Sequence, residues 1–156
     1  MFKNLWVPTL ALLLLTACSK DELGPDEVLF GHFYGMCIGE ACIEIFKISD
    51  DALLEDTTDQ YPGNAEPYDG TFQMLPADRF EQVRDLRDQI PTELFEESER
   101  VIGAPDATDG GGYYLQARSS DGELHFWLMD TDKRRLPEYL HDFVDVLADY
   151  IQRAQG

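Results

Sequence analysis

Two β-prone runs joined by a tight-turn sequence constrain the fold of this chain more than any other feature. Residues 113–118 and 123–129 flank Ser119-Ser120-Asp121-Gly122. Aspartate followed by glycine between such runs favours a reversal of the chain, because glycine adopts positive φ angles without a steric penalty. The pattern therefore predicts a β-hairpin, and with it an antiparallel sheet.

A second hairpin is predicted within residues 28–48, which are rich in aromatic and β-branched side chains. Residues 43–48 alternate apolar and polar side chains, as is typical of a strand buried on one face. Residues 52–56 and 71–75 are candidates for short strands. The stretches 57–70 and 100–112 contain proline and glycine, and we expect them to be exposed loops.

Two main helices are predicted from apolar residues at helical intervals. Asp78 and Glu81 form a capping-box pattern at the start of the first helix, which continues to Ile90. We expect residues 92–96 to form a further short helical piece. A last helix starts at residue 136, and its apolar stripe consists of Leu136, Leu140, Phe143, Val144, Leu147, Tyr150 and Ile151.

This order of elements predicts an α+β fold. We expect an antiparallel sheet built from two hairpins plus one or two short strands, with the two main helices packed on one face. The second face of the sheet is then the best place to look for a recognition surface.

The N-terminus has the layout of a cleaved signal peptide: Lys3, a short apolar run over residues 5–15, and Thr16-Ala17-Cys18. The run has about 11 residues, whereas a membrane-spanning helix needs roughly 20. Small residues before a cysteine resemble a lipobox, so we expect residues 1–17 to be removed and Cys18 to be lipidated. Residues 18–27 would form a tether and 28–156 one globular domain. The alternative is an ordinary secretory signal with an unrelated cysteine.

The charge of the chain limits its partners. Removing residues 1–17 takes away Lys3 and no acid, which lowers the formal net charge from −19 to −20. So acidic a domain repels nucleic acid and anionic lipid surfaces. We expect no nucleic-acid partner and no cofactor; the expected partners are the membrane, through the lipid, and a protein or glycan. A purely solubilising role of the charge is the alternative.

Cys37 and Cys42 remain after lipidation of Cys18, separated by four residues. If those four form a hairpin loop, the two thiols face each other and can form a disulfide, which the envelope permits. Free thiols, a redox pair or a metal site are the alternatives. A redox motif more usually has two intervening residues, and a zinc site needs two further ligands.

Asp106 and Asp109 lie in a glycine-rich loop and are candidates for binding a cation such as Ca²⁺. The spacing does not fit an EF-hand. The alternative is a turn whose aspartates accept local backbone hydrogen bonds.

The predicted hairpin 113–129 carries two aromatic pairs, Tyr113-Tyr114 and Phe126-Trp127. Neighbours on a strand point to opposite faces, so we expect one residue of each pair in the core and the other in an exposed patch that recognises a partner or sugar.

Three histidines, His32, His125 and His141, share no metal-binding spacing, and no nucleophile motif accompanies them. We therefore expect no enzymatic activity.

Two groups of segments together resemble a group of small lipoproteins of the Bacteroidota that has no assigned activity. The first is Phe33-Tyr34-Gly35-Met36-Cys37 with residues 42–47. The second is Pro105-Asp106, residues 109–115, Trp127, residues 130–133 and Leu136-Pro137-Glu138-Tyr139-Leu140. Members of the group often have cysteines beside the Pro-Asp pair, where this chain has Ala104 and Ala107. That departure removes any thiol site from this loop.

The resemblance implies an outer-membrane lipoprotein, and Lys20-Asp21-Glu22 looks like a signal for export to the cell surface. We expect a surface-exposed lipoprotein with a non-enzymatic binding or envelope-structural role. The alternative is an acidic immunity or inhibitor protein that neutralises a basic toxin or hydrolase.

Overall fold

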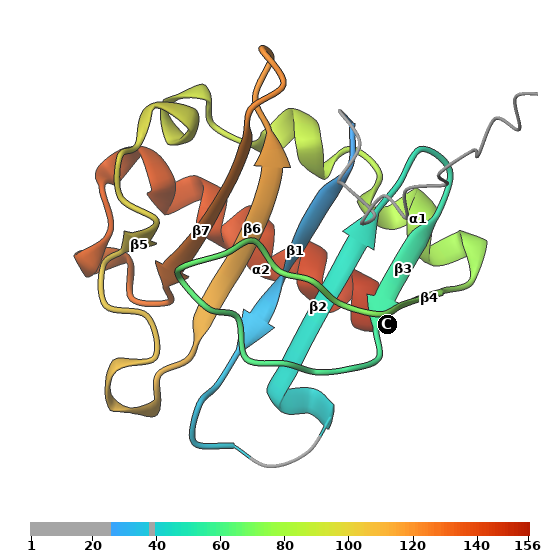
Figure 1. The fold of residues 1–156 in the computed structure, drawn as a ribbon, viewed down its shortest axis with the longest axis horizontal. Coiled ribbons are helices and arrows are strands. Elements are labelled where there is room, and N and C mark those ends of the chain that lie inside the picture. The colour runs from blue at the N-terminus through green and yellow to red at the C-terminus, as the bar shows by residue number, and fades with distance from the viewer. Residues whose placement is uncertain (1–25, 38–39) are drawn as a thin grey trace, which may run out of the picture.

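The computed structural model describes residues 26–37 and 40–156, so the predicted signal peptide 1–17, the lipidation site Cys18 and most of the tether 18–27 lie outside the described residues. The described chain forms one seven-stranded sheet in the order β4-β3-β2-β1-β6-β7-β5 (Figure 1). The strands are β1 (Val28–Phe33), β2 (Ile43–Ile48), β3 (Leu53–Asp56), β4 (Phe72–Met74), β5 (Val101–Ile102), β6 (Gly112–Arg118) and β7 (Leu124–Asp130).

Both predicted hairpins are present and lie side by side in the sheet. β1 pairs antiparallel with β2 and, on its other side, with β6, so the first strand of the sheet is also its central strand. β6 and β7 form the Asp-Gly hairpin. β5 was not predicted; it pairs parallel with β7 through only Val101 and Ile102. The predicted α+β class, with a mainly antiparallel sheet, is confirmed.

The helices α1 (Ala77–Val83) and α2 (His141–Gln155) pack on one face of the sheet, behind the strands in Figure 1. α2 buries one stripe of apolar side chains against the sheet, which stabilises the helix by removing apolar surface from water. Short 3₁₀ turns connect the elements: Glu40–Cys42, Leu86–Gln89, Thr92–Glu96, Ala107–Asp109, Lys133–Arg135 and Glu138–Leu140.

Both predicted helix starts are wrong by a few residues, and a proline explains each case. α1 begins at Ala77 after Pro76, and no side chain caps it, so the Asp78 capping box does not form. α2 begins at His141, because Pro137 precedes a 3₁₀ turn at the predicted start. The fixed φ of proline suits the residue before a helical turn. α1 also ends at Val83, and a 3₁₀ turn over Leu86–Gln89 replaces the second half of the predicted helix.

The second face of the sheet is covered by residues 57–71, which we call the strap. It leaves the end of β3, crosses in front of β2, β1 and β6, and returns to β4 (Figure 1). A second buried apolar cluster lies on this face, and the strap residue Tyr68 packs against it. β2 is therefore covered on both faces, and the expectation of one buried face for residues 43–48 is wrong. Glu44 and Lys47 are three positions apart, which places them on opposite faces of the strand.

Asp56 fastens both ends of the strap. Its carboxylate lies at the end of β3 and is only 3% exposed. The donors to this carboxylate are the Thr58 N–H and hydroxyl, the Asp59 N–H, the Tyr68 hydroxyl and the Thr71 N–H. A buried carboxylate needs such donors to offset its lost hydration. One side chain thus fixes where the strap leaves the sheet and where it returns.

Cys37 and Cys42 form a disulfide, and the pairing predicted from the sequence is confirmed. The bridge joins Cys37, within the connection between β1 and β2, to Cys42, the last residue of the 3₁₀ turn that precedes β2, and Cys42 is buried. It closes the connection between two neighbouring strands of the sheet.

Candidate functional site

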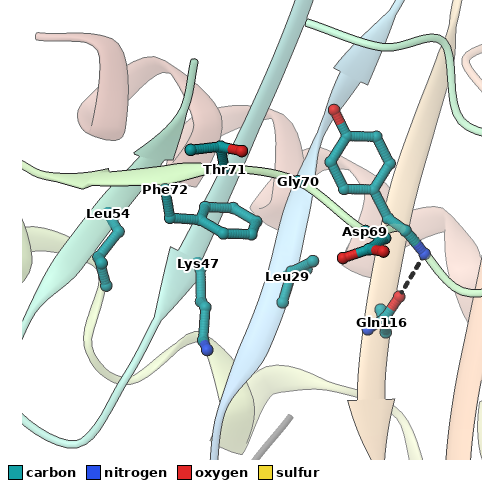
Figure 2. A pocket seen from close by; sticks show the side chains of 9 residues that line it. Leu29, Lys47, Leu54, Asp69, Gly70, Thr71, Phe72 and Gln116 are labelled. Atoms are coloured by element: carbon teal, nitrogen blue, oxygen red, sulfur yellow. Dashed lines mark hydrogen bonds between the residues drawn. The ribbon is translucent and has the colours of Figure 1, made fainter. Parts of the chain in front are cut away.

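A pocket of about 420 Å³ lies between the sheet and the strap (Figure 2). Its floor is a single row of paired residues that crosses four strands. Leu54 of β3 pairs with Lys47 of β2, Lys47 with Leu29 of β1, and Leu29 with Gln116 of β6. Side chains in one row share a face and repeat about every 4.8 Å across the strands. The floor therefore alternates apolar and polar groups.

The strap and the start of β4 form the roof and one wall of the pocket, from Tyr68 to Phe72. The Tyr68 hydroxyl and the Thr71 N–H donate to Asp56 over 2.7 and 2.6 Å, which fixes both ends of this segment. Gly70 is required between them, because a Cβ at this position would lie 2.4 Å from a carboxylate oxygen of Asp56. The pocket wall is thus held in place before any ligand binds.

Gln116 is the most buried polar side chain of the floor, with 4% of its surface exposed. Its Oε1 accepts hydrogen bonds from the Tyr114 hydroxyl at 2.5 Å and from the Tyr68 N–H at 3.0 Å. A backbone N–H only donates, so the carboxamide atom facing Tyr68 is the oxygen. The other terminal atom of the Gln116 side chain is therefore the donor nitrogen Nε2. Within the described part of the chain, Nε2 has no acceptor. The pocket therefore presents a carboxamide donor to a ligand.

Lys47 is the cation of the floor. Its ammonium lies 3.2 Å from a carboxylate oxygen of Glu27, and the two side chains are 17% and 18% exposed. An ammonium has three N–H donors and can bind a second acceptor beside Glu27. The partly buried position strengthens its attraction for an anion relative to a lysine in bulk water.

The tyrosines around the pocket are neutral hydrogen-bond donors at physiological pH. Burial, followed by the Asp56 carboxylate, raises the pKa of Tyr68. Burial also raises the pKa of Tyr114. Both hydroxyls keep their protons and hold Asp56 and Gln116 in position. The pocket offers hydrogen-bond donors, one cation and apolar surface, which suits the binding of a small polar ligand.

Asp106 joins three parts of the chain. Its carboxylate accepts hydrogen bonds from the Gly35 N–H at 2.8 Å, the Tyr61 hydroxyl at 3.1 Å and the Gly111 N–H at 3.2 Å. Burial and this carboxylate raise the pKa of Tyr61 to about 12. Asp109 is exposed. Among the described residues, no group of three or more potential ligands could hold a metal ion.

The expected patch of exposed aromatic side chains on the β6–β7 hairpin is wrong. Tyr114, Phe126 and Trp127 are buried, and Tyr113 is half-buried. Tyr114 and Phe126 lie on the second face, where Tyr68 packs near Tyr114 and the Arg100 guanidinium covers Phe126. Trp127 is part of the core beneath the helices, and Tyr113 packs against that core. The sequence did not show the two groups responsible, the strap residue Tyr68 against Tyr114 and the Arg100 side chain over Phe126.

The three histidines lie in different surroundings. His32 Nε2 is 3.2 Å from the Ala41 carbonyl oxygen, and burial lowers the pKa of its imidazole. His125 stacks on Trp127, and His141 Nε2 is 3.2 Å from the Leu136 carbonyl oxygen. His125 Nε2 also lies 3.9 Å from a carboxylate oxygen of the exposed Glu123.

Lys47 and Gln116 were missed as site residues by sequence reasoning. The signal that could have drawn attention to Gln116 is its place between Leu115 and Ala117 inside a predicted buried strand. Polar side chains at such positions need a partner. The placement of Lys47 and Gln116 in one row depends on pairing between β1 and β6, which are about 80 residues apart in the chain.

No helix in the described ranges has the length and apolar character needed to cross a bilayer. Comparison of the chain with protein families, with curated proteins and with solved structures yields no match.

Proposed function

We propose that the protein is a lipid-anchored, surface-exposed envelope protein with a non-enzymatic binding role, and that the strap pocket is its ligand site. The observation that supports binding is the preformed pocket, in which a buried carboxamide and a partly buried ammonium lie on one row of the floor.

Preorganisation favours this interpretation. Asp56 holds the strap through five donor groups, so little additional ordering is needed when a ligand enters. A site that is ordered beforehand loses less conformational entropy on binding. The polar floor also distinguishes the pocket from a gap in an apolar core, where unpaired donors would be costly.

The anchor rests on the sequence from Lys3 to Cys18. We expect the wild-type protein to fractionate with the outer membrane, to incorporate labelled fatty acid and to be digested by protease added to intact cells. Cys18→Ala should abolish fatty-acid labelling and leave the precursor uncleaved. Labelling of the Cys18→Ala variant at wild-type level would contradict the anchor, and protection from protease in intact cells would contradict surface exposure.

Binding is tested with the mature chain, residues 18–156, carrying Cys18→Ser to avoid lipid. The protein is incubated with an envelope extract, and retained molecules are identified by mass spectrometry. Leu54→Trp places a large ring in the pocket, whereas Gln73→Trp adds the same ring at an exposed position of β4. We expect retention by the wild type and Gln73→Trp and loss in Leu54→Trp; Leu54→Phe serves if the larger ring prevents folding.

Equal retention by the pocket-filled and control variants would contradict the proposal. Retention of one basic protein and of no small molecule would also contradict the pocket and would favour the inhibitor alternative.

A further inference from the structure

We propose that the ligand of the strap pocket is a short peptide of two or three residues with a free C-terminal carboxylate and apolar side chains. This inference rests on the proposed function, because it assigns a ligand class to the same pocket. It follows from the order of charged, donor and apolar groups along the floor and wall.

The C-terminal carboxylate is assigned to Lys47. Its ammonium is the only cationic group among the residues that line the pocket. Glu27 contacts it at 3.2 Å and leaves N–H donors for a second acceptor. A hydrogen bond between ionised partners in a partly buried position is stronger than one between neutral groups.

The backbone carbonyl of the peptide is assigned to Gln116. Its Nε2 is a donor in a side chain that is 96% buried, and no described residue accepts from it. Gln116 lies two strands from Lys47 in the same row, which places their Cα atoms roughly 10 Å apart. An extended peptide spans at most about 3.5 Å per residue, so two or three residues match this separation.

The N-terminal ammonium is assigned to Asp69. Tyr68, the preceding residue, donates its N–H to Gln116, so Asp69 lies at the Gln116 end of the pocket, away from Lys47 (Figure 2). A carboxylate at this end repels the anionic end of a ligand and attracts a cationic one. The two ends of the pocket therefore match the two charged ends of a peptide, in a fixed direction.

The apolar side chains are assigned to the surfaces between these charges. Leu29 lies in the row between Lys47 and Gln116, and Leu54 and Phe72 line the side nearer Lys47 (Figure 2). Burying aliphatic side chains against them contributes favourable free energy in proportion to the area removed from water. A fatty acid would use this surface and Lys47, but would leave the Gln116 donor and Asp69 without partners.

Binding is measured by ¹H–¹⁵N NMR titration of the mature chain carrying Cys18→Ser, with four probes: Leu-Leu, its C-terminal amide, its N-acetyl derivative and octanoate. We expect Leu-Leu to shift resonances of the floor and strap. The C-terminal amide should bind at least about tenfold more weakly and the N-acetyl derivative about threefold more weakly, following the loss of one charged contact each. Octanoate binding as tight as Leu-Leu, or equal binding of the amide, would overturn the inference.

Three variants test the assigned contacts against a matched control. Lys47→Met and Gln116→Glu should each weaken Leu-Leu binding at least about tenfold. Gln116→Glu keeps an oxygen for Tyr68 and replaces the donor amide. Asp69→Asn, at an exposed position, should weaken Leu-Leu about threefold and leave the N-acetyl derivative unaffected. The control Lys133→Met removes a half-buried lysine far from the pocket lining, which pairs with Asp145, and should change nothing.

The two proposals fail in different ways. If Leu54→Trp retains the same molecules as the wild type, the pocket is not a binding site and both proposals fail. If Leu54→Trp abolishes retention but Leu-Leu does not bind, or binds independently of Lys47 and Asp69, only the peptide assignment fails. If Lys47→Met does not fold, the Asp69→Asn variant decides the outcome. Weaker binding of Leu-Leu with unchanged binding of the N-acetyl derivative supports the peptide assignment, and equal changes for both probes contradict it.

Discussion

Replacing Asp56 with alanine should release the strap and destabilise the protein by about 3 kcal/mol. The carboxylate accepts hydrogen bonds from five donor groups. Three of these, on Thr58 and Asp59, lie directly after β3 and can be hydrated when the carboxylate is removed. The Tyr68 hydroxyl and the Thr71 N–H lie at the far end of the strap, and each loses a charged acceptor. At roughly 1.5 kcal/mol for each such bond, these two account for the expected loss.

The loss is measured by equilibrium unfolding in urea, followed by the fluorescence of the buried Trp127. Asp51→Ala, at an exposed turn, is the matched control and should change the free energy of unfolding by less than about 0.5 kcal/mol. Amide hydrogen exchange should speed up within residues 57–71 of Asp56→Ala and remain unchanged in α2. A loss below about 1 kcal/mol with unchanged exchange in the strap would refute the role of Asp56 as its fastener.

Three further predictions concern pH and the disulfide. Burial raises the pKa of six tyrosines, so the folded state holds these protons more tightly than the unfolded state. The free energy of unfolding should therefore fall as the pH rises above about 10. Absorbance at alkaline pH should show phenol ionisation coupled to unfolding, and independent titration of all phenols would contradict this. The six are Tyr61, Tyr68, Tyr113, Tyr114, Tyr139 and Tyr150. Burial lowers the pKa of His32, so its contribution to stability should be lost as the pH falls below about 6.5. Between pH 7.5 and 5 the free energy of unfolding of His32→Asn should decrease less than that of the wild type. An identical pH dependence in both proteins would refute this. Replacing both Cys37 and Cys42 by serine should cost about 2 kcal/mol in the urea assay, because a six-residue loop gains conformational entropy in the unfolded chain, and reduction of the wild type should give the same loss.

The hairpins were predictable because their signals are local. Asp121-Gly122 and the residues beside it favour a turn, and the strands on either side pair directly across that turn. The helix starts were less predictable, since Pro76 and Pro137 compete with side-chain caps within a few residues. The disulfide was the preferred interpretation of the spacing between Cys37 and Cys42, and the structure confirms it.

The strap and its pocket were not predictable from local patterns. The proline- and glycine-containing stretch after Asp56 has the composition of an exposed loop, and it is mostly exposed on its outer side. What brings it onto the sheet is a set of contacts with distant partners, among them Tyr68 with Gln116 and Tyr61 with Asp106. Tyr68 of the strap covers Tyr114, and Arg100 covers Phe126, which a one-sided sheet would have left accessible.

The central position of β1 has a mechanical consequence for a chain tethered at Cys18. A pull from the membrane would enter the domain at Val28 and run along β1, which is held by six residue pairs on each side. Such a load acts on both rows of hydrogen bonds in shear, so they resist together instead of opening one after another from an end. An edge strand at the same place would peel away under a far smaller force. If Cys18 carries the proposed lipid, the strand nearest the anchor would be the one best able to hold the domain in place under load.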